Sequence, residues 1–98
     1  MKRYKVEFSE SAEAELRASI EWGMAEWGAD ATFKWARELR TMTIKLLGSF
    51  PESQPLAPES EVDGNEIRQL VVGRYRLLYN IEGKVVNILL LRGPSTGR

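Results

Sequence analysis

Cysteine and histidine are both absent from this sequence of 98 residues. The absence of cysteine excludes disulfides and thiolate nucleophiles, and the absence of histidine removes the side chain that most readily moves protons near neutral pH. Most zinc sites are excluded with them. We therefore expect no metal and no cofactor, and few of the usual enzyme mechanisms are open to this chain.

Long hydrophobic runs are also missing. The longest aliphatic stretch covers only residues 88–91, whereas a membrane-spanning helix needs roughly 20 apolar residues. The first eight residues alternate in polarity and do not form the apolar centre of a targeting peptide. The sequence therefore predicts a cytoplasmic protein with no membrane association.

Neither sign of charge is in excess, because 14 Lys and Arg balance 14 Asp and Glu. No overall field attracts the molecule to nucleic acid or anionic lipid, so any such contact has to be local. The charges are separated along the chain: residues 1–64 hold eight basic and twelve acidic side chains, and residues 65–98 hold six and two. Length and composition predict one globular domain over residues 1–98.

The first elements are predicted to be a strand and a helix. Residues 3–8 alternate, with Tyr4, Val6 and Phe8 on one side, which is the period of a half-buried strand. Ser9 then offers a hydroxyl to the free N–H groups of a helix that begins near Glu10. Along this helix, apolar residues at spacings of three and four form one stripe, which consists of Ala12, Leu16, Ile20, Gly23 and Trp27.

A second helix is predicted over residues 31–47. Gly28 can close the first helix in a left-handed conformation, and Asp30 can cap the second one. Gly48 is expected to end it. Residues 27–30 thus form the tight turn of a helical hairpin.

The second helix has more apolar surface than one packing face needs. Trp35, Met42 and Leu46 lie beside its stripe and widen the apolar arc to roughly 200°, so something besides the core has to cover them. The stripe itself consists of Phe33, Ala36, Leu39, Thr43 and Leu47.

The rest of the chain is predicted to be a loop and three strands. Residues 52–66 are acidic and contain two prolines, which favours a long loop. Residues 67–72, 74–81 and 84–92 are rich in β-branched and aliphatic residues and are separated by turn signals. The order strand, helix, helix and three-strand antiparallel meander predicts an α+β fold in which the helical hairpin covers one face of the sheet.

Four arginines in the sheet region are the strongest candidates for a contact surface. Strands hold long side chains at fixed separations, and guanidinium groups suit carboxylate and phosphate partners. The alternative is a polar sheet face on which each arginine pairs with an acid of the long loop. Both interpretations remain open for Arg68, Arg74, Arg76 and Arg92.

Other candidates have simpler structural explanations. Ser9 could be a nucleophile, but no base lies near it in sequence and a helix cap accounts for it better. The acids of residues 52–66 could bind a cation, but they lack the spacing of a calcium loop. Trp22, Trp35 and Met42 could be core residues, although a domain this short has little interior in which to hide three tryptophans.

Four short motifs follow one another along the chain. They are Phe8-Ser9-x-x-Ala12-x-x-x-Leu16, Trp27-Gly28, Ile44-x-x-Leu47-x-x-Phe50-Pro51 and Arg68-x-Leu70-x-x-Gly73-x-Tyr75-Arg76-x-x-Tyr79. In this order and spacing they resemble the RelE/ParE superfamily of toxins from type II toxin–antitoxin pairs. The resemblance extends over residues 4–92, and the fold that it implies agrees with the one that periodicity predicts.

The resemblance leaves two branches to distinguish. RelE-like members cut messenger RNA in the ribosome, with basic residues in the loop and strands and a basic or aromatic residue near the end. Here the loop is acidic, and Gly93 stands where many relatives have a histidine. The Trp-Gly turn and the neutral charge favour the ParE-like branch, whose members inhibit DNA gyrase and have no accepted catalytic residues.

The ParE-like branch implies a toxin that is not an enzyme and that a cognate ParD-like antitoxin neutralises. The antitoxin is expected to lay an amphipathic helix on the hairpin, extend along the sheet, and supply the operator-DNA contacts that the toxin lacks. The expected antitoxin-binding residues are Trp22, Trp35, Met42, Leu46, Arg74 and Arg76, and the expected target-binding residues are Arg68, Arg76 and Arg92. The alternatives are a RelE-like endonuclease, for which Arg68, Arg74, Arg76 and Tyr79 survive, and a non-toxic binding module on the same fold.

Overall fold

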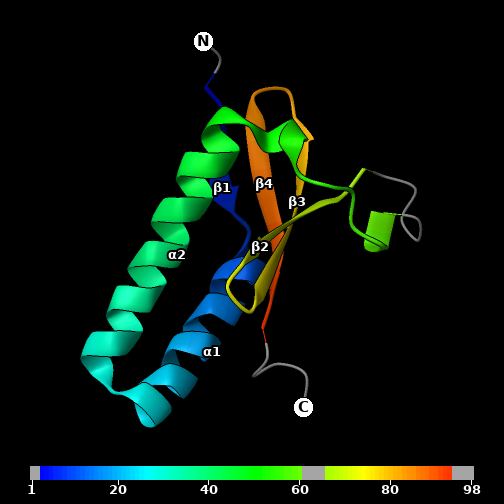
Figure 1. Ribbon diagram of the computed structural model, residues 1–98. Helices are drawn as coiled ribbons and strands as arrows, with labels where there is room; N and C mark the ends of the chain where they lie inside the picture. Colours follow the sequence, from blue (N-terminus) through cyan, green and yellow to red (C-terminus); the bar gives the residue numbers. More distant parts are fainter. Residues whose placement is uncertain (1–2, 61–65, 94–98) are drawn as a thin grey trace.

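The computed structural model describes residues 3–60 and 66–93 (Figure 1). The elements follow the predicted order, and the α+β class is confirmed. They are β1 (Lys5–Phe8), α1 (Glu10–Trp27), α2 (Ala29–Ser49), the short 3-10 helix η1 (Pro51–Ser53), β2 (Arg68–Val72), β3 (Tyr75–Glu82) and β4 (Val85–Arg92).

The helical hairpin turns on a single glycine. Ser9 caps α1 as predicted, and its hydroxyl oxygen accepts a hydrogen bond from the Ala12 N–H at 3.0 Å. Gly28 is the only residue between the helices and has φ +91°, a conformation that side chains disfavour. The predicted cap at Asp30 is wrong, because the chain reverses at Gly28 and α2 has already begun at Ala29.

The buried face of α2 differs by one residue from the predicted stripe. Thr32 is buried, and Phe33, which the stripe included, is 50% exposed. A threonine can be buried here because its hydroxyl donates to the Gly28 carbonyl oxygen at 2.7 Å. Gly48 does not end the helix as predicted, since α2 continues to Ser49.

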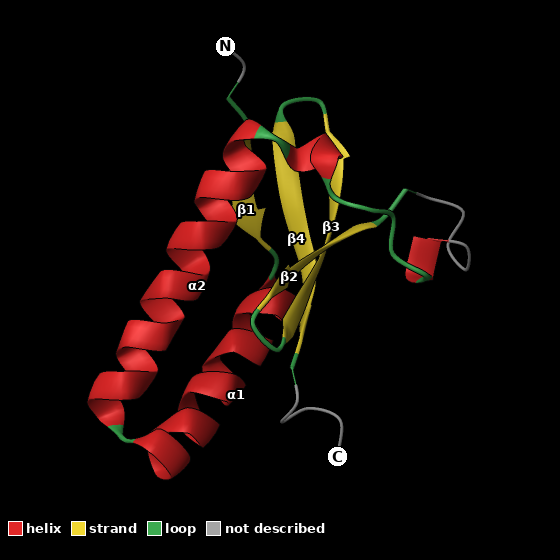
Figure 2. Ribbon diagram, viewed as in Figure 1, coloured by secondary structure: helices red, strands yellow, loops and turns green. Residues whose placement is uncertain are grey.

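The strands form one sheet in the order β1-β4-β3-β2, with the helices on one face (Figure 2). The predicted antiparallel meander of β2, β3 and β4 is confirmed, and β1 pairs with β4 in parallel. Between the helices and the sheet lies the main core. Its buried members are Ala12, Leu16, Leu39, Leu47, Leu70, Tyr75, Leu77, Tyr79, Val86, Ile88 and Leu91.

Residues Gln54–Ser60, which we name the cover segment, run along the edge of β2, and from Ala57 onward they cover part of the face opposite the helices. Its main chain is hydrogen-bonded to β2 and to the residue just before β2. The Gln69 N–H donates to the Pro55 carbonyl oxygen at 3.0 Å, and the Ala57 N–H donates to the Ile67 carbonyl oxygen at 2.7 Å. Ala57 and Ile67 pack with Leu78 in a second, smaller apolar cluster. The connection predicted as loop thus contains η1 and main-chain bonds to the β2 edge, and Glu61 and Asp63 lie outside the described residues.

Candidate partner-binding surfaces

A row of aromatic rings joins the tip of the hairpin to the sheet. Trp22 and Trp27 meet edge to face with centroids 5.1 Å apart, Trp27 and Trp35 lie 6.0 Å apart, and Trp35 lies 4.9 Å from Tyr75. Trp22 and Trp35 are therefore half-buried by intramolecular contacts, and Trp27 is 46% exposed. The rings stiffen the hairpin against the sheet.

A groove of about 640 Å³ lies between α2 and the turn that joins β2 to β3. We name it the α2 groove. Of the predicted antitoxin-binding residues, Trp35 and Met42 line it, and Met42 is 50% exposed. Its lining residues do not include Trp22, Leu46, Arg74 or Arg76. Sequence reasoning missed the opposite wall, formed by Val72 and Gly73, although the strand-turn signal at these residues could have pointed to it.

The α2 groove adjoins an open strand edge. β2 is at the end of the sheet, and its Gln69 N–H points away from β3 toward the cover segment. Because strand residues alternate, the main-chain groups of Val71 point the same way. No described residue pairs with them, and Val71 is 58% exposed. This edge can accept an extended segment of another chain.

The four candidate arginines do not form one surface. Arg68 has the same parity as Leu70 and so lies on the helix side of the sheet, where it donates to the Gln54 carbonyl oxygen at 2.6 Å. Arg74 is exposed in the two-residue turn between β2 and β3, not in a strand as predicted. Only Arg76 and Arg92 face each other, as cross-strand partners on the face opposite the helices. The predicted target-binding set is thus divided between two faces.

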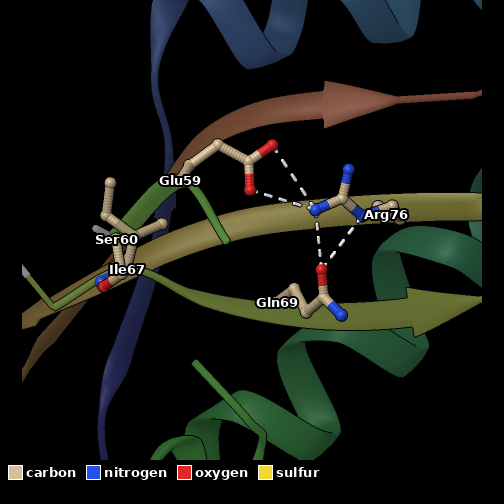
Figure 3. Close-up of polar contacts among 5 residues, drawn as sticks. All are labelled: Glu59, Ser60, Ile67, Gln69 and Arg76. Carbon is tan, nitrogen blue, oxygen red and sulfur yellow. Dashed lines mark hydrogen bonds and ion pairs between the residues drawn. The ribbon is translucent and has the colours of Figure 1, made fainter. Parts of the chain in front are cut away.

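Arg76 is held in place by two side chains (Figure 3). Its Nε and one terminal nitrogen donate to the Gln69 side-chain oxygen at 3.0 and 2.7 Å. The same terminal nitrogen lies 3.1 Å from the Glu59 carboxylate of the cover segment. Pairing with an acid of the long connection is therefore confirmed for Arg76, and also for Arg68, which lies 3.8 Å from the Glu66 carboxylate. Arg76 and Glu59 are each about one third exposed.

The Glu59 carboxyl has a pKa below its usual value of 4.5. A backbone hydrogen bond is the main cause, and the Arg76 hydrogen bond and charge and the Arg92 charge act in the same direction. Partial burial acts against them. Glu59 is thus an ionised carboxylate in the field of both outward arginines.

Tyr79 is a structural residue. It is fully buried and donates its hydroxyl hydrogen to the Pro51 carbonyl oxygen. Burial raises the pKa of Tyr79 to about 12, although the charge of Arg68 opposes the shift. A phenol that is so weakly acidic and so inaccessible is poorly suited to exchange protons with a substrate near neutral pH.

Other proposed chemistry finds little geometric support. The Ser9 hydroxyl both caps α1 and donates to the Leu89 carbonyl oxygen at 2.9 Å, which supports the structural interpretation. In the described part of the chain, no three acidic side chains gather as a metal site would require. A Cβ atom at Gly93 would lie 2.1 Å from the Tyr75 ring, so this position has no room for a larger side chain without movement.

No helix within the described ranges is long and apolar enough to cross a membrane. This agrees with the short aliphatic runs of the sequence.

The fold of this chain, a helical hairpin on one face of a four-stranded sheet, is shared with a solved structure titled "Chromosomal ParDE TA system from P. aeruginosa". The superposition has a TM-score of 0.77 and covers 93% of this chain and 96% of the other, at 20% sequence identity. No curated protein sequence matches the chain.

The sequence places the chain more narrowly. The family model described as "ParE toxin of type II toxin-antitoxin system, parDE" matches residues 6–93. The chain therefore belongs to the ParE toxin family, as its motifs predicted.

Proposed function

We propose that this protein is the toxin of a type II toxin–antitoxin pair, that it inhibits DNA gyrase in the cytoplasm, and that a ParD-like antitoxin neutralises it. In this proposal it acts by binding other macromolecules and not as an enzyme. The observation that most supports this is the α2 groove beside the open edge of β2, in a chain of the ParE family. The solved neighbour is itself a chain of a ParDE system.

The α2 groove fits the apolar side of an antitoxin helix. Such helices bind through a few apolar anchors that enter a groove, and Met42 and Trp35 line this one. Leu46 is partly exposed one helical turn after Met42 and extends the same apolar side of α2. Arg74, in the turn next to Gly73, can receive an acidic antitoxin side chain. Trp22 remains a proposed contact at the hairpin tip, outside the groove.

The target surface is proposed to be the sheet face opposite the helices. Arg76 and Arg92 are neighbours there, whereas Arg68 is bonded to Gln54 on the other side. We therefore assign Arg76 and Arg92 to target binding and withdraw Arg68 from this set. Arg76 was expected in both partner-binding sets, but it lies on the face opposite the α2 groove, and we therefore assign it to target binding alone.

The nuclease alternative has weaker support in the geometry. Tyr79 is buried in a hydrogen bond, and the Tyr75 ring fills the space next to Gly93 where many relatives carry a histidine. Metal-free cleavage of RNA needs a base for the 2′-hydroxyl and an acid for the leaving oxygen.

Induction of the gene in cells, with and without a candidate antitoxin gene encoded beside it, tests the proposal. We expect growth arrest without the neighbour, relief with it, and no new cuts in messenger RNA by primer extension. Discrete cuts at defined codons would instead support the endonuclease, and harmless expression would support a non-toxic binding module.

A further inference from the structure

Two cations face each other on the outer surface of the sheet. Arg76 of β3 and Arg92 of β4 are register partners, and both side chains point away from the helices. Like charges directly opposite each other on a sheet are destabilising. An anion bound between the two guanidinium groups would therefore relieve their repulsion.

Glu59 of the same chain supplies such an anion. Its two carboxylate oxygens lie 3.1 and 3.4 Å from one terminal nitrogen of Arg76. Figure 3 shows the carboxylate pointing toward this nitrogen. The Gln69 oxygen fixes the orientation of the guanidinium from the other side. The site is thus preorganised for one carboxylate, and it is occupied by one.

The carboxylate of Glu59 can leave without unfolding the cover segment. The main chain is anchored before Glu59 by the Ala57 bond to Ile67 and after it by the Ser60 hydroxyl, which accepts from the Ile67 N–H at 2.6 Å. Neither anchor uses the Glu59 side chain. A change of side-chain rotamer is sufficient to free Arg76, and both members of the ion pair are about one third exposed.

We propose that Arg76, Arg92 and Gln69 form a binding site for a carboxylate side chain of an acidic protein partner, and that Glu59 is a built-in competitor that lowers the affinity for that partner. The inference rests on the proposed function only in taking the partner to be a protein. Partner binding replaces one carboxylate by another, so the net cost of opening the site is small and the site stays satisfied in both states.

A protein carboxylate fits this surface better than nucleic acid does. The resident group is a carboxylate, and Glu82 shares the face with Arg76, since both are even-numbered residues of β3. The whole chain has a net charge of zero. A polyanion with a charge at every nucleotide meets acids as well as arginines on this face, whereas a single carboxylate needs only the two arginines.

The test is Glu59→Gln, with Glu52→Gln as the matched control. Both changes remove one negative charge and so raise the net charge of the chain by one. Glu52 lies exposed in η1, and no hydrogen bond or ion pair joins its side chain to a described residue. Binding of a fluorescein-labelled polyglutamate peptide is measured by anisotropy at low ionic strength, and an oligothymidylate of the same net charge is the second probe. Circular dichroism checks that each variant is folded.

We expect Glu59→Gln to bind polyglutamate about three- to fivefold more tightly than the native chain, the size of effect of a partly exposed ion pair. Glu52→Gln should change the affinity little, and adding Arg92→Gln to Glu59→Gln should remove the gain. Equal gains for both glutamate variants would overturn the inference, as would an unfolded Glu59→Gln variant, an unchanged affinity, or an equal gain for oligothymidylate. Neither gyrase nor antitoxin enters this assay, so a failure of the proposed function would leave its result unaffected.

Discussion

Tyr79 donates its hydroxyl hydrogen to the main-chain carbonyl oxygen of Pro51. Both residues are buried, so the bond ties the centre of the sheet to the segment that follows α2. Tyr75, on the same strand and the same face, has a buried hydroxyl with no hydrogen-bond partner among the described residues. Two tyrosines in similar surroundings therefore differ in whether the hydroxyl is satisfied.

This difference predicts opposite effects of the same substitution. Tyr79→Phe leaves the buried Pro51 carbonyl without its donor and should lower the free energy of unfolding by about 1–3 kcal/mol. Tyr75→Phe removes an unsatisfied polar group and should be neutral or slightly stabilising. Urea denaturation measures both variants. Equal losses of stability would contradict the assignment of the hydrogen bond.

The raised pKa of Tyr79 predicts how stability depends on alkaline pH. A pKa of about 12 in the folded state, against 10 for the ordinary group, favours the neutral phenol in the fold. The corresponding stability is complete below pH 10 and is lost as the pH rises through about 12. The native chain should therefore lose more stability than Tyr79→Phe over this range. Denaturation at several pH values checks this, and a difference between the two proteins that stays constant with pH would refute it.

Gly93 is predicted to be required for packing. An alanine Cβ there would lie 2.1 Å from the Tyr75 ring, which is buried and cannot move aside freely. Gly93→Ala should therefore cost about 1–3 kcal/mol of unfolding free energy. Gly48→Ala is the control, because its nearest neighbour would be at 3.5 Å and alanine is the better helix former. The packing account fails if Gly93→Ala is as stable as the native chain.

The α2 groove makes a prediction about the antitoxin. A Met42→Ala, Leu46→Ala double variant should bind the cognate antitoxin about tenfold or more weakly, since apolar anchors contribute most of the energy of such interfaces. Trp35 is left intact because it packs on Tyr75, and its loss would mix stability with binding. Titration calorimetry gives the affinities.

The control for the groove is Ile44→Ala. Ile44 is similarly exposed but lies beside Arg3 and Tyr4 in a separate hollow on the other flank of α2. Its loss should leave antitoxin affinity nearly unchanged. An equal loss in both variants, or none in the double variant, would reject the groove as the antitoxin site.

Most of the fold follows from periodicity and capping in the sequence. The alternation before Ser9, its role as a cap and the β-branched strands all depend on near neighbours, and local patterns record such effects well. Phe33 was misplaced because the predicted stripe started from the large apolar side chain at the beginning of the helix and passed over the neighbouring Thr32. A hydroxyl that returns to the carbonyl four residues earlier can be buried like a methyl group.

The sites were harder to predict because they depend on contacts between distant residues. The parallel pairing of β1 with β4 and the contact of Glu59 with Arg76 join segments that no local pattern relates. That Arg68 and Arg76 lie on opposite faces of the sheet could have been predicted from the alternation of strand residues, since Arg68 shares a face with the core residue Leu70. Grouping the arginines by residue type concealed it.

The central claim is that the protein acts by binding gyrase, and the most direct measurement is the supercoiling of relaxed plasmid by purified gyrase in its presence. The account predicts inhibition that the cognate antitoxin reverses and that charge reversal at Arg76 and Arg92 weakens, while the variant remains folded. Undisturbed supercoiling, together with cleavage of messenger RNA on purified ribosomes, would contradict it.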